Sequence, residues 1–183
     1  DAHDRTEAAL RIAVERARVA KAQDARKPAR YFKSVQILCI SGPNLQLLGM
    51  REPEIYGKET LREIHARLAK KAAALGVNVT CKQTNHEGTI VDWIGSAPKK
   101  FAGLLLNAGA FTHTSLAIFD AIKATNLPCV EVHLSNPEAR ETYRAASRIA
   151  GACVGKVSGF GGDSYVLALE GLALRLRNSV RAS

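Results

Sequence analysis

The chain has 183 residues, 46% of them hydrophobic, which suits one well-buried α/β domain and is too short for two. Its 26 Lys and Arg against 17 Asp and Glu give a net charge of +9, but much of this excess lies near the two ends of the chain. No apolar run approaches the roughly 20 residues that cross a bilayer, and no Lys-Arg block is interleaved with aromatic residues, so we expect neither a membrane span nor a nucleic-acid partner.

Residues 1–34 form an Ala-rich, charged segment with nine Lys or Arg and five Asp or Glu. Leu10 and Val14 stand at helical spacing, which predicts a helix that ends before Pro28. The segment has neither the apolar stretch of a secretory signal nor the Ser-rich, acid-poor composition of a transit peptide. We therefore expect a basic helical extension, residues 1–34, before a single α/β domain, residues 35–183, in a cytoplasmic protein.

From residue 36 onward, short β-branched runs alternate with helical patterns, which predicts βαβ units and a parallel sheet. Thr60 with Glu63 is typical of a capped helix start, and Gly76 of a helix end. The expected strands are 36–41, 77–83, 102–107, 128–133 and 152–157, and the expected helices are 59–75, 88–98, 114–125, 138–146 and 163–178. Five strands in a chain of this length favour a flavodoxin-like doubly wound sheet of order 2-1-3-4-5 in a three-layer α/β/α fold.

Four cysteines, one in each of four predicted strands, lack the CxxC spacing of a zinc or redox site. They are Cys39, Cys81, Cys129 and Cys153. We interpret them as reduced core thiols of a protein from a reducing compartment.

The first strand runs into a long loop that carries Asn44, Arg51 and Tyr56. In open parallel sheets, ligands bind outside the carboxyl ends of the strands. A guanidinium beside a tyrosine favours the phenolate and lowers the pKa of the phenol, so Arg51 and Tyr56 are candidates for acid-base chemistry. The alternative is a surface loop in which these two residues have no joint role.

The strand that ends at Asn107 is followed by His113 at a predicted helix start, where free N–H groups favour an anion or a hydroxyl-rich ligand. Thr114 and Ser115 beside it also have a simpler interpretation as helix caps.

Glu131 and His133 end the fourth predicted strand and share one of its faces, because side chains alternate along a strand. A carboxylate there can orient an imidazole that acts as a general acid. A lone histidine at a strand end is often only structural, but several polar strand ends at one edge favour a functional site. His86, His113 and His133 lack the spacing of metal ligands, so we expect no metal.

Five segments in order, within about residues 36–175, resemble the type II 3-dehydroquinate dehydratases. They are GPNLQLLGMREPEIYG, NHEGTIVDWI, NAGAFTHTS with Asp120 after it, EVHLSN and ARETYR. The resemblance implies a hydro-lyase that reversibly converts 3-dehydroquinate into 3-dehydroshikimate by anti elimination through an enolate, with no cofactor and no metal. It also implies a homo-oligomer, a dodecamer built from trimers, that serves shikimate biosynthesis or quinate catabolism.

The resemblance also implies roles for individual residues. Tyr56 would remove the C2 proton, and Arg51 would hold Tyr56 as phenolate. Asn44 would position a water on the enolate oxygen. His133 would protonate the departing C1 hydroxyl while Glu131 holds His133. The residues that would bind the substrate are Asn107, His113, Arg144, Leu134 through its backbone, and Ser135.

Asp120 would reach the site of a neighbouring subunit, and residues 47–57 would form a lid over the substrate. Gln46 and Met50 depart from the common family pattern beside this lid. Two other functions remain open on the same fold, an FMN- or nucleotide-binding module and a non-catalytic oligomerisation scaffold. The scaffold would leave Arg51, Tyr56 and His133 without a joint purpose.

Overall fold

The computed structural model describes residues 35–50 and 58–182, with side chains as far as residue 179. Five parallel strands form one sheet in the order β2-β1-β3-β4-β5. The strands are β1 (Gln36–Ser41), β2 (Asn78–Gln83), β3 (Gly103–Asn107), β4 (Cys129–His133) and β5 (Gly155–Ser158). This order confirms the predicted flavodoxin-like, doubly wound sheet.

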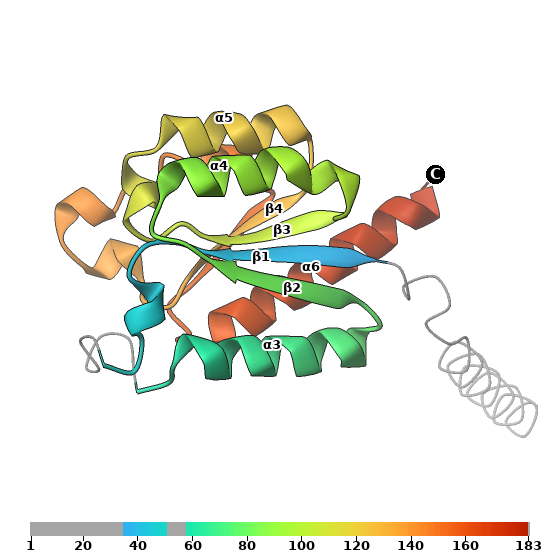
Figure 1. Cartoon of the computed structure of the whole chain (residues 1–183), viewed down its shortest axis with the longest axis horizontal. Helices are drawn as coiled ribbons and strands as arrows, with labels where there is room; N and C mark the ends of the chain where they lie inside the picture. Colours follow the sequence, from blue (N-terminus) through green and yellow to red (C-terminus); the bar gives the residue numbers. More distant parts are fainter. Residues whose placement is uncertain (1–34, 51–57, 183) are drawn as a thin grey trace, which may run out of the picture. The chain divides into compact units, whose positions relative to one another are not determined.

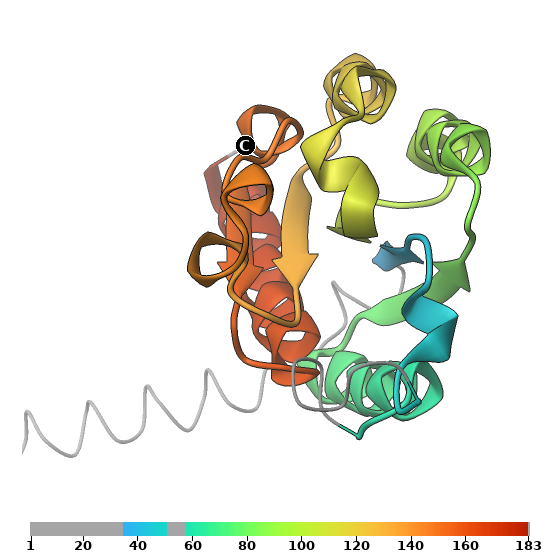
Figure 2. The same ribbon diagram turned by 90° about the vertical axis from the view of Figure 1, so that its left-hand side faces the viewer.

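Two helices cover each face of the sheet, as Figure 1 and the turned view in Figure 2 show. On one face lie α4 (Glu87–Ser96) and α5 (Leu116–Thr125), and on the other α3 (Leu61–Leu75) and α6 (Asp163–Ala182). The residues that form the core between the sheet and the α4–α5 layer include Leu38, Ile40, Leu104 and Leu106 from the strands and Ile90, Ile94, Ile118 and Ile122 from the helices. Strands β1, β3 and β4 are apolar along most of their length because both of their faces are covered.

The predicted helix boundaries on either side of α3 are confirmed by their caps. Thr60 Oγ1 accepts from the Glu63 N–H at 3.3 Å, and Glu63 Oε2 accepts from the Thr60 N–H at 2.8 Å, which forms a capping box. Gly76 ends the helix with φ of 71°, a left-handed conformation that suits glycine. Ser115 Oγ likewise caps α5, because it accepts from the Ile118 N–H at 2.9 Å.

The predicted helix over residues 138–146 is wrong. Two 3-10 turns, η4 (Pro137–Ala139) and η5 (Thr142–Arg144), occupy this stretch, and the backbone of Arg140 between them is extended. The segment presents no periodic apolar face, and most of its side chains are exposed, so a helix there would have had little surface to bury. The turns instead leave the side chains of Arg140 and Arg144 beside the sheet edge.

The last strand is shorter than predicted. Residues 150–152 form a 3-10 turn, η6 (Ala150–Ala152), and β5 begins only at Gly155, so Cys153 lies before the strand and not within it. The small residues of this stretch have little strand propensity, which explains the late start.

No helix in the described part of the chain combines the length and the apolar composition that crossing a membrane requires. The predicted helix and domain boundary of residues 1–34, and the larger part of the predicted lid, residues 51–57, lie outside the described residues.

Candidate active site

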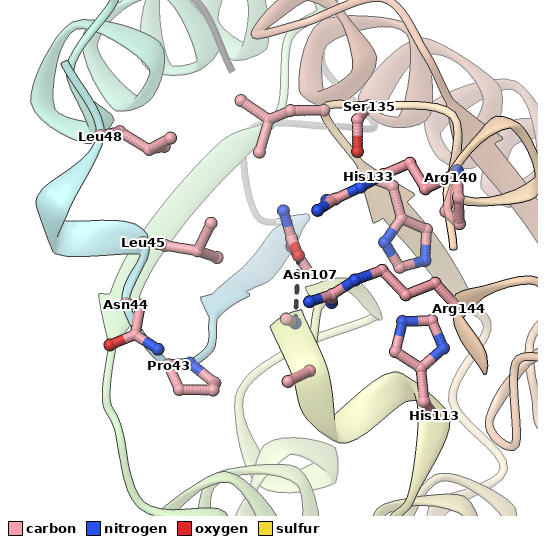
Figure 3. Close-up of a pocket in the computed structure, with 14 residues that line it drawn as sticks. Pro43, Asn44, Leu45, Leu48, Asn107, His113, His133, Ser135, Arg140 and Arg144 are labelled. Carbon is pink, nitrogen blue, oxygen red and sulfur yellow. Dashed lines mark hydrogen bonds between the residues drawn. The ribbon is translucent and has the colours of Figure 1, made fainter. Parts of the chain in front are cut away.

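A pocket lies at the carboxyl ends of β1, β3 and β4, where parallel α/β sheets bind ligands (Figure 3). The residues that line it are Pro43, Asn44, Leu45, Leu48, Asn107, Gly109, Ala110, His113, His133, Leu134, Ser135, Pro137, Arg140 and Arg144. These described residues include two arginines and two histidines but no carboxylate side chain. The pocket therefore suits a small anionic ligand with polar substituents.

The loop after β1 is held tightly against the end of β3. The Gly42 N–H donates to the Asn107 carbonyl at 2.8 Å, and a Cβ at Gly42 would lie 2.6 Å from the Ala108 carbonyl oxygen, so glycine is required. Asn44 adopts a left-handed conformation with φ of 66°, and its N–H donates to Asn85 Oδ1 at 3.0 Å. These contacts place Asn44 at the rim of the pocket.

Glu131 and His133 form a buried acid-base pair at the end of β4, as predicted. His133 Nε2 donates to Glu131 Oε1 at 2.7 Å, and Glu131 is fully buried behind the imidazole. Two hydroxyl groups also donate to this carboxylate, Thr112 Oγ1 to Oε1, and Ser147 Oγ to its two oxygens at 2.9 and 3.0 Å. The contacts fix the tautomer and the orientation of the ring, with Nδ1 left for a ligand.

The surroundings of Glu131 favour its ionised form. Burial raises the pKa of Glu131, but hydrogen bonds from His133, Thr112 and Ser147 outweigh burial and hold this pKa below its ordinary value. Sequence reasoning missed Thr112 and Ser147, because a threonine in a short turn and a serine in a polar loop carry no signal that both reach the same carboxylate.

We expect Glu131→Gln to weaken the acid dependence of folding stability. Because the pKa of Glu131 is lower in the folded chain than in the unfolded chain, its stabilising contribution is complete above the ordinary carboxyl pKa of about 4.3 and is lost as pH falls through the folded value. Glutamine does not titrate, so the variant should not show the part of the acid-induced loss of stability that comes from Glu131. Urea unfolding of wild type and variant at pH about 7 and about 3 measures the difference.

The matched control is Glu170→Gln, which removes a surface carboxylate paired with Lys71. This control should keep the acid dependence of the wild type. If acid lowered the folding stability of Glu131→Gln as steeply as that of the wild type, the assignment of an ionised, stabilising Glu131 would be contradicted.

Asn107 offers a donor that the described residues leave unsatisfied. Its Oδ1 accepts from the Gly109 N–H at 3.2 Å, while its buried Nδ2 has no hydrogen-bond partner in the described part of the chain. A buried donor without a partner is unfavourable, so an acceptor atom of a ligand beside Asn107 would relieve this penalty.

The hydrogen bond that His113 makes at Nδ1 leaves Nε2 as the atom available to a ligand. Its Nδ1 lies 2.8 Å from the Ala146 carbonyl, which can only accept, so Nδ1 carries the proton and Nε2 is left as the acceptor in the neutral ring. Figure 3 shows His113 and His133 on the side of the pocket opposite Pro43, Asn44 and Leu45.

Two arginines from the η4–η5 segment supply positive charge. Arg144 Nε donates to Glu141 Oε2 at 3.0 Å, and Arg140 Nε lies 3.4 Å from the same oxygen. In Figure 3 both side chains extend across the pocket toward Asn107. Arg144 was predicted as a binding residue, whereas Arg140 was not. The motif that contains Arg140 was noted, but the sequence carried no signal that Arg140 itself lines the pocket.

The described pocket does not include all of the predicted site residues. Asp120 is exposed on α5 and does not line the pocket of its own chain. Arg51 and Tyr56 lie outside the described residues. Ser115 Oγ accepts from the Ile118 N–H at 2.9 Å, so Ser115 is a helix cap of α5, the simpler of its two interpretations.

Gln46 points away from the pocket. Its Oε1 accepts from Gln83 Nε2 at 2.9 Å, so it binds the end of β2. Met50 is 79% exposed and lines a different surface cavity. Neither departure from the family pattern places a side chain in the pocket.

The described residues of the pocket contain no set of three close His, Cys, Asp or Glu ligand atoms. The fold and the site thus define an α/β protein with a buried Glu131–His133 pair beside a basic, donor-rich pocket. A family model described as Dehydroquinase class II matches residues 35–173. The chain belongs to the class II dehydroquinase family.

Individual relatives agree with this assignment. The chain is 54% identical over 137 residues to a 3-dehydroquinate dehydratase of Prochlorococcus marinus, with 75% of this chain and 92% of the relative covered. It is 53% identical over 146 residues to a 3-dehydroquinate dehydratase of Nostoc sp., with 80% and 99% covered. A crystal structure of the type II dehydroquinase of Propionibacterium acnes has a TM-score of 0.75 and 40% identity, with 78% and 99% covered. The family resemblance inferred from the motifs is confirmed, and a nucleotide-binding module is not favoured.

Proposed function

We propose that the chain is a 3-dehydroquinate dehydratase, a hydro-lyase that converts 3-dehydroquinate into 3-dehydroshikimate. In addition to family membership, the observation that most directly supports the proposal is the buried Glu131–His133 pair at the edge of a basic pocket. The substrate is a polyhydroxylated carboxylate, and the cations and donors of the pocket match its acid and hydroxyl groups.

The first step is loss of the C2 proton. Tyr56 takes this proton as a phenolate that Arg51 stabilises, and the C–H electron pair moves to form the enolate of the C3 ketone. Asn44 holds a water on the enolate oxygen, which disperses the negative charge as it develops. The position of Asn44 at the pocket rim supports its part, while Tyr56 and Arg51 are assigned from the family motif.

The second step expels the C1 hydroxyl. The enolate electrons return to form the C1–C2 double bond, and His133 donates a proton to the oxygen, which leaves as water. Glu131 orients His133 and balances the charge of the imidazolium before transfer. The product is a conjugated enone.

An imine mechanism would need a lysine in the pocket, and none lines it among the described residues. Lys82 Nζ lies 4.7 Å from the centre of the Trp93 ring, and Lys156 pairs with Glu138. No described residue of the pocket is a lysine, and residues 51–57 contain none. These observations favour the enolate over a covalent intermediate.

The remaining pocket residues bind the substrate. Arg144 faces the carboxylate or a hydroxyl as a charged donor, while Asn107 donates and His113 Nε2 accepts. The Leu134 backbone and the Ser135 hydroxyl complete the set at the end of β4.

We expect Asn107→Ala to raise KM about tenfold, the effect of losing one neutral hydrogen bond, with a smaller change in kcat. Steady-state rates from the absorbance of the enone product measure both constants. Asn78→Ala, at the exposed amino end of β2, is the control and should behave as wild type. An unchanged KM in Asn107→Ala would remove Asn107 from substrate binding.

We further propose a cytoplasmic dodecamer built from trimers, in which Asp120 reaches the site of a neighbouring subunit. Leu116 and Asp120 are four residues apart on α5 and share one face, and Leu116 is 64% exposed. An exposed leucine beside this acid supports a subunit contact on that face.

Light scattering should give a mass twelve times that of the 19.7 kDa chain, and Leu116→Arg should lower this mass. A monomer in the wild type would contradict the assembly. The reaction serves either shikimate biosynthesis or quinate catabolism, which share this step.

A further inference from the structure

Two thiols and an imidazole converge on the face of the sheet that α3 and α6 cover. The ligand atoms of Cys39, His65 and Cys81 all lie within 4.8 Å of one another. Cys39 on β1 and Cys81 on β2 are register partners, so their side chains leave the sheet on the same face, and His65 reaches them from α3. We call these three residues the Cys-His cluster.

Cys39 and Cys81 are free thiols, and their sulfur atoms lie within 4.8 Å of each other. Cys129 and Cys153 form a second pair of neighbouring free thiols. No third ligand joins that second pair within the described part of the chain. The imidazole therefore distinguishes the Cys-His cluster from an ordinary pair of core cysteines.

A buried hydrogen-bond chain orients His65. Its Nε2 lies 3.3 Å from Ser41 Oγ, which lies 3.1 Å from the hydroxyl of Tyr165, and both of these partners are fully buried. The ring of Tyr165 also meets the imidazole edge to face, with centroids 6.4 Å apart. Partners of this kind commonly fix the ring of a metal-binding histidine.

The cluster is open to small ligands from one side. His65 and Cys81 line a surface cavity together with residues that include Met50, Thr60 and Gln83, while Cys39 is fully buried and does not line this cavity. This cavity differs from the active-site pocket, although Leu48 contributes to both. An ion can therefore reach His65 and Cys81 without crossing the substrate site, and the Cys39 sulfur lies within 4.8 Å of their ligand atoms.

We propose that Cys39, Cys81 and His65 bind one Zn²⁺ ion, with a water molecule from the surface cavity as the fourth ligand. Binding releases the two thiol protons, and two thiolates with a neutral imidazole leave the complex without net charge, which suits a half-buried position. Thiolate and imidazole donors select zinc over the hard cations magnesium and calcium. The site takes no part in the dehydration and goes beyond the proposed function.

The three ligand atoms lie almost as close together as a tetrahedral zinc site requires. Bond lengths of about 2.3 Å to sulfur and about 2.0 Å to nitrogen, at tetrahedral angles, place the ligand atoms about 3.5 to 3.8 Å apart. From separations of at most 4.8 Å, the side chains close by about 1 Å. Rotations of Cys81 and His65, which are only partly buried, provide this movement.

The test is zinc affinity of the full chain, stripped of metal and kept reduced, in competition with a chromophoric chelator. Wild type should bind one Zn²⁺ per chain, and Co²⁺ in its place should show the thiolate charge-transfer and visible bands of a tetrahedral site. Cys81→Ser and His65→Gln should each weaken binding by about 100-fold or more. Cys153→Ser, the matched change in the second thiol pair, should leave binding unchanged.

A melting curve for each variant checks that it is folded, and the use of two variants protects the test if one of them is not. The proposal is overturned if the wild type binds no zinc, if binding survives both cluster variants, or if it is lost in Cys153→Ser.

Discussion

Tyr56→Phe is expected to lower kcat by about 10³-fold or more while substrate affinity changes little. Phenylalanine keeps the ring and its packing but has no oxygen to take the C2 proton. Turnover is measured from the enone absorbance, and affinity from calorimetric titration with 3-dehydroquinate. A large fall in kcat with retained binding is the signature of a group that acts in the transition state.

Tyr143→Phe provides the control for the loss of a tyrosine hydroxyl. Tyr143 is 66% exposed, and its ring centre lies 5.2 Å from Arg144 Cζ, a contact that phenylalanine preserves. This control should keep wild-type turnover. Near-wild-type turnover in Tyr56→Phe would instead remove Tyr56 from the role of base.

His133→Asn is expected to lower kcat by about 10²- to 10⁴-fold. Asparagine can still donate to the buried carboxylate of Glu131, so the fold is retained, but it cannot protonate the leaving hydroxyl. Added imidazole should restore part of the rate, because a small diffusible acid can occupy the space of the missing ring. Steady-state kinetics with and without imidazole measure both effects.

The matched control is His86→Asn, since His86 is exposed at the start of α4 and does not line the pocket. Its turnover should match wild type without imidazole. If His133→Asn fell by no more than His86→Asn, His133 would not be the general acid.

The positions of most strands and the Glu131–His133 pair were predictable from the sequence because both depend on short-range patterns, and the strand order followed from the usual topology of a five-strand doubly wound sheet. Alternating β-branched runs and helical periods define parallel strands, and a two-residue spacing places two side chains on one strand face. The helix caps at Thr60 and Gly76 were predictable for the same reason.

Features that depend on register or on loop shape were not predictable. The pairing of Cys39 with Cys81 follows from the alignment of β1 with β2, which spacing along the chain does not encode. Thr112 and Ser147 meet at Glu131 only because two irregular segments fold over the end of β4. The pair of turns that replaces the helix at 138–146 reflects the same lack of a periodic signal.

The most direct test of dehydratase activity is to mix the full chain, freed of metal by a chelator, with 3-dehydroquinate and to follow the ultraviolet absorbance of the conjugated enone. We expect immediate formation of 3-dehydroshikimate at an undiminished rate, since the acid, the base and the enolate donors all belong to the chain. A folded, oligomeric protein that forms no enone under these conditions would contradict the proposed function.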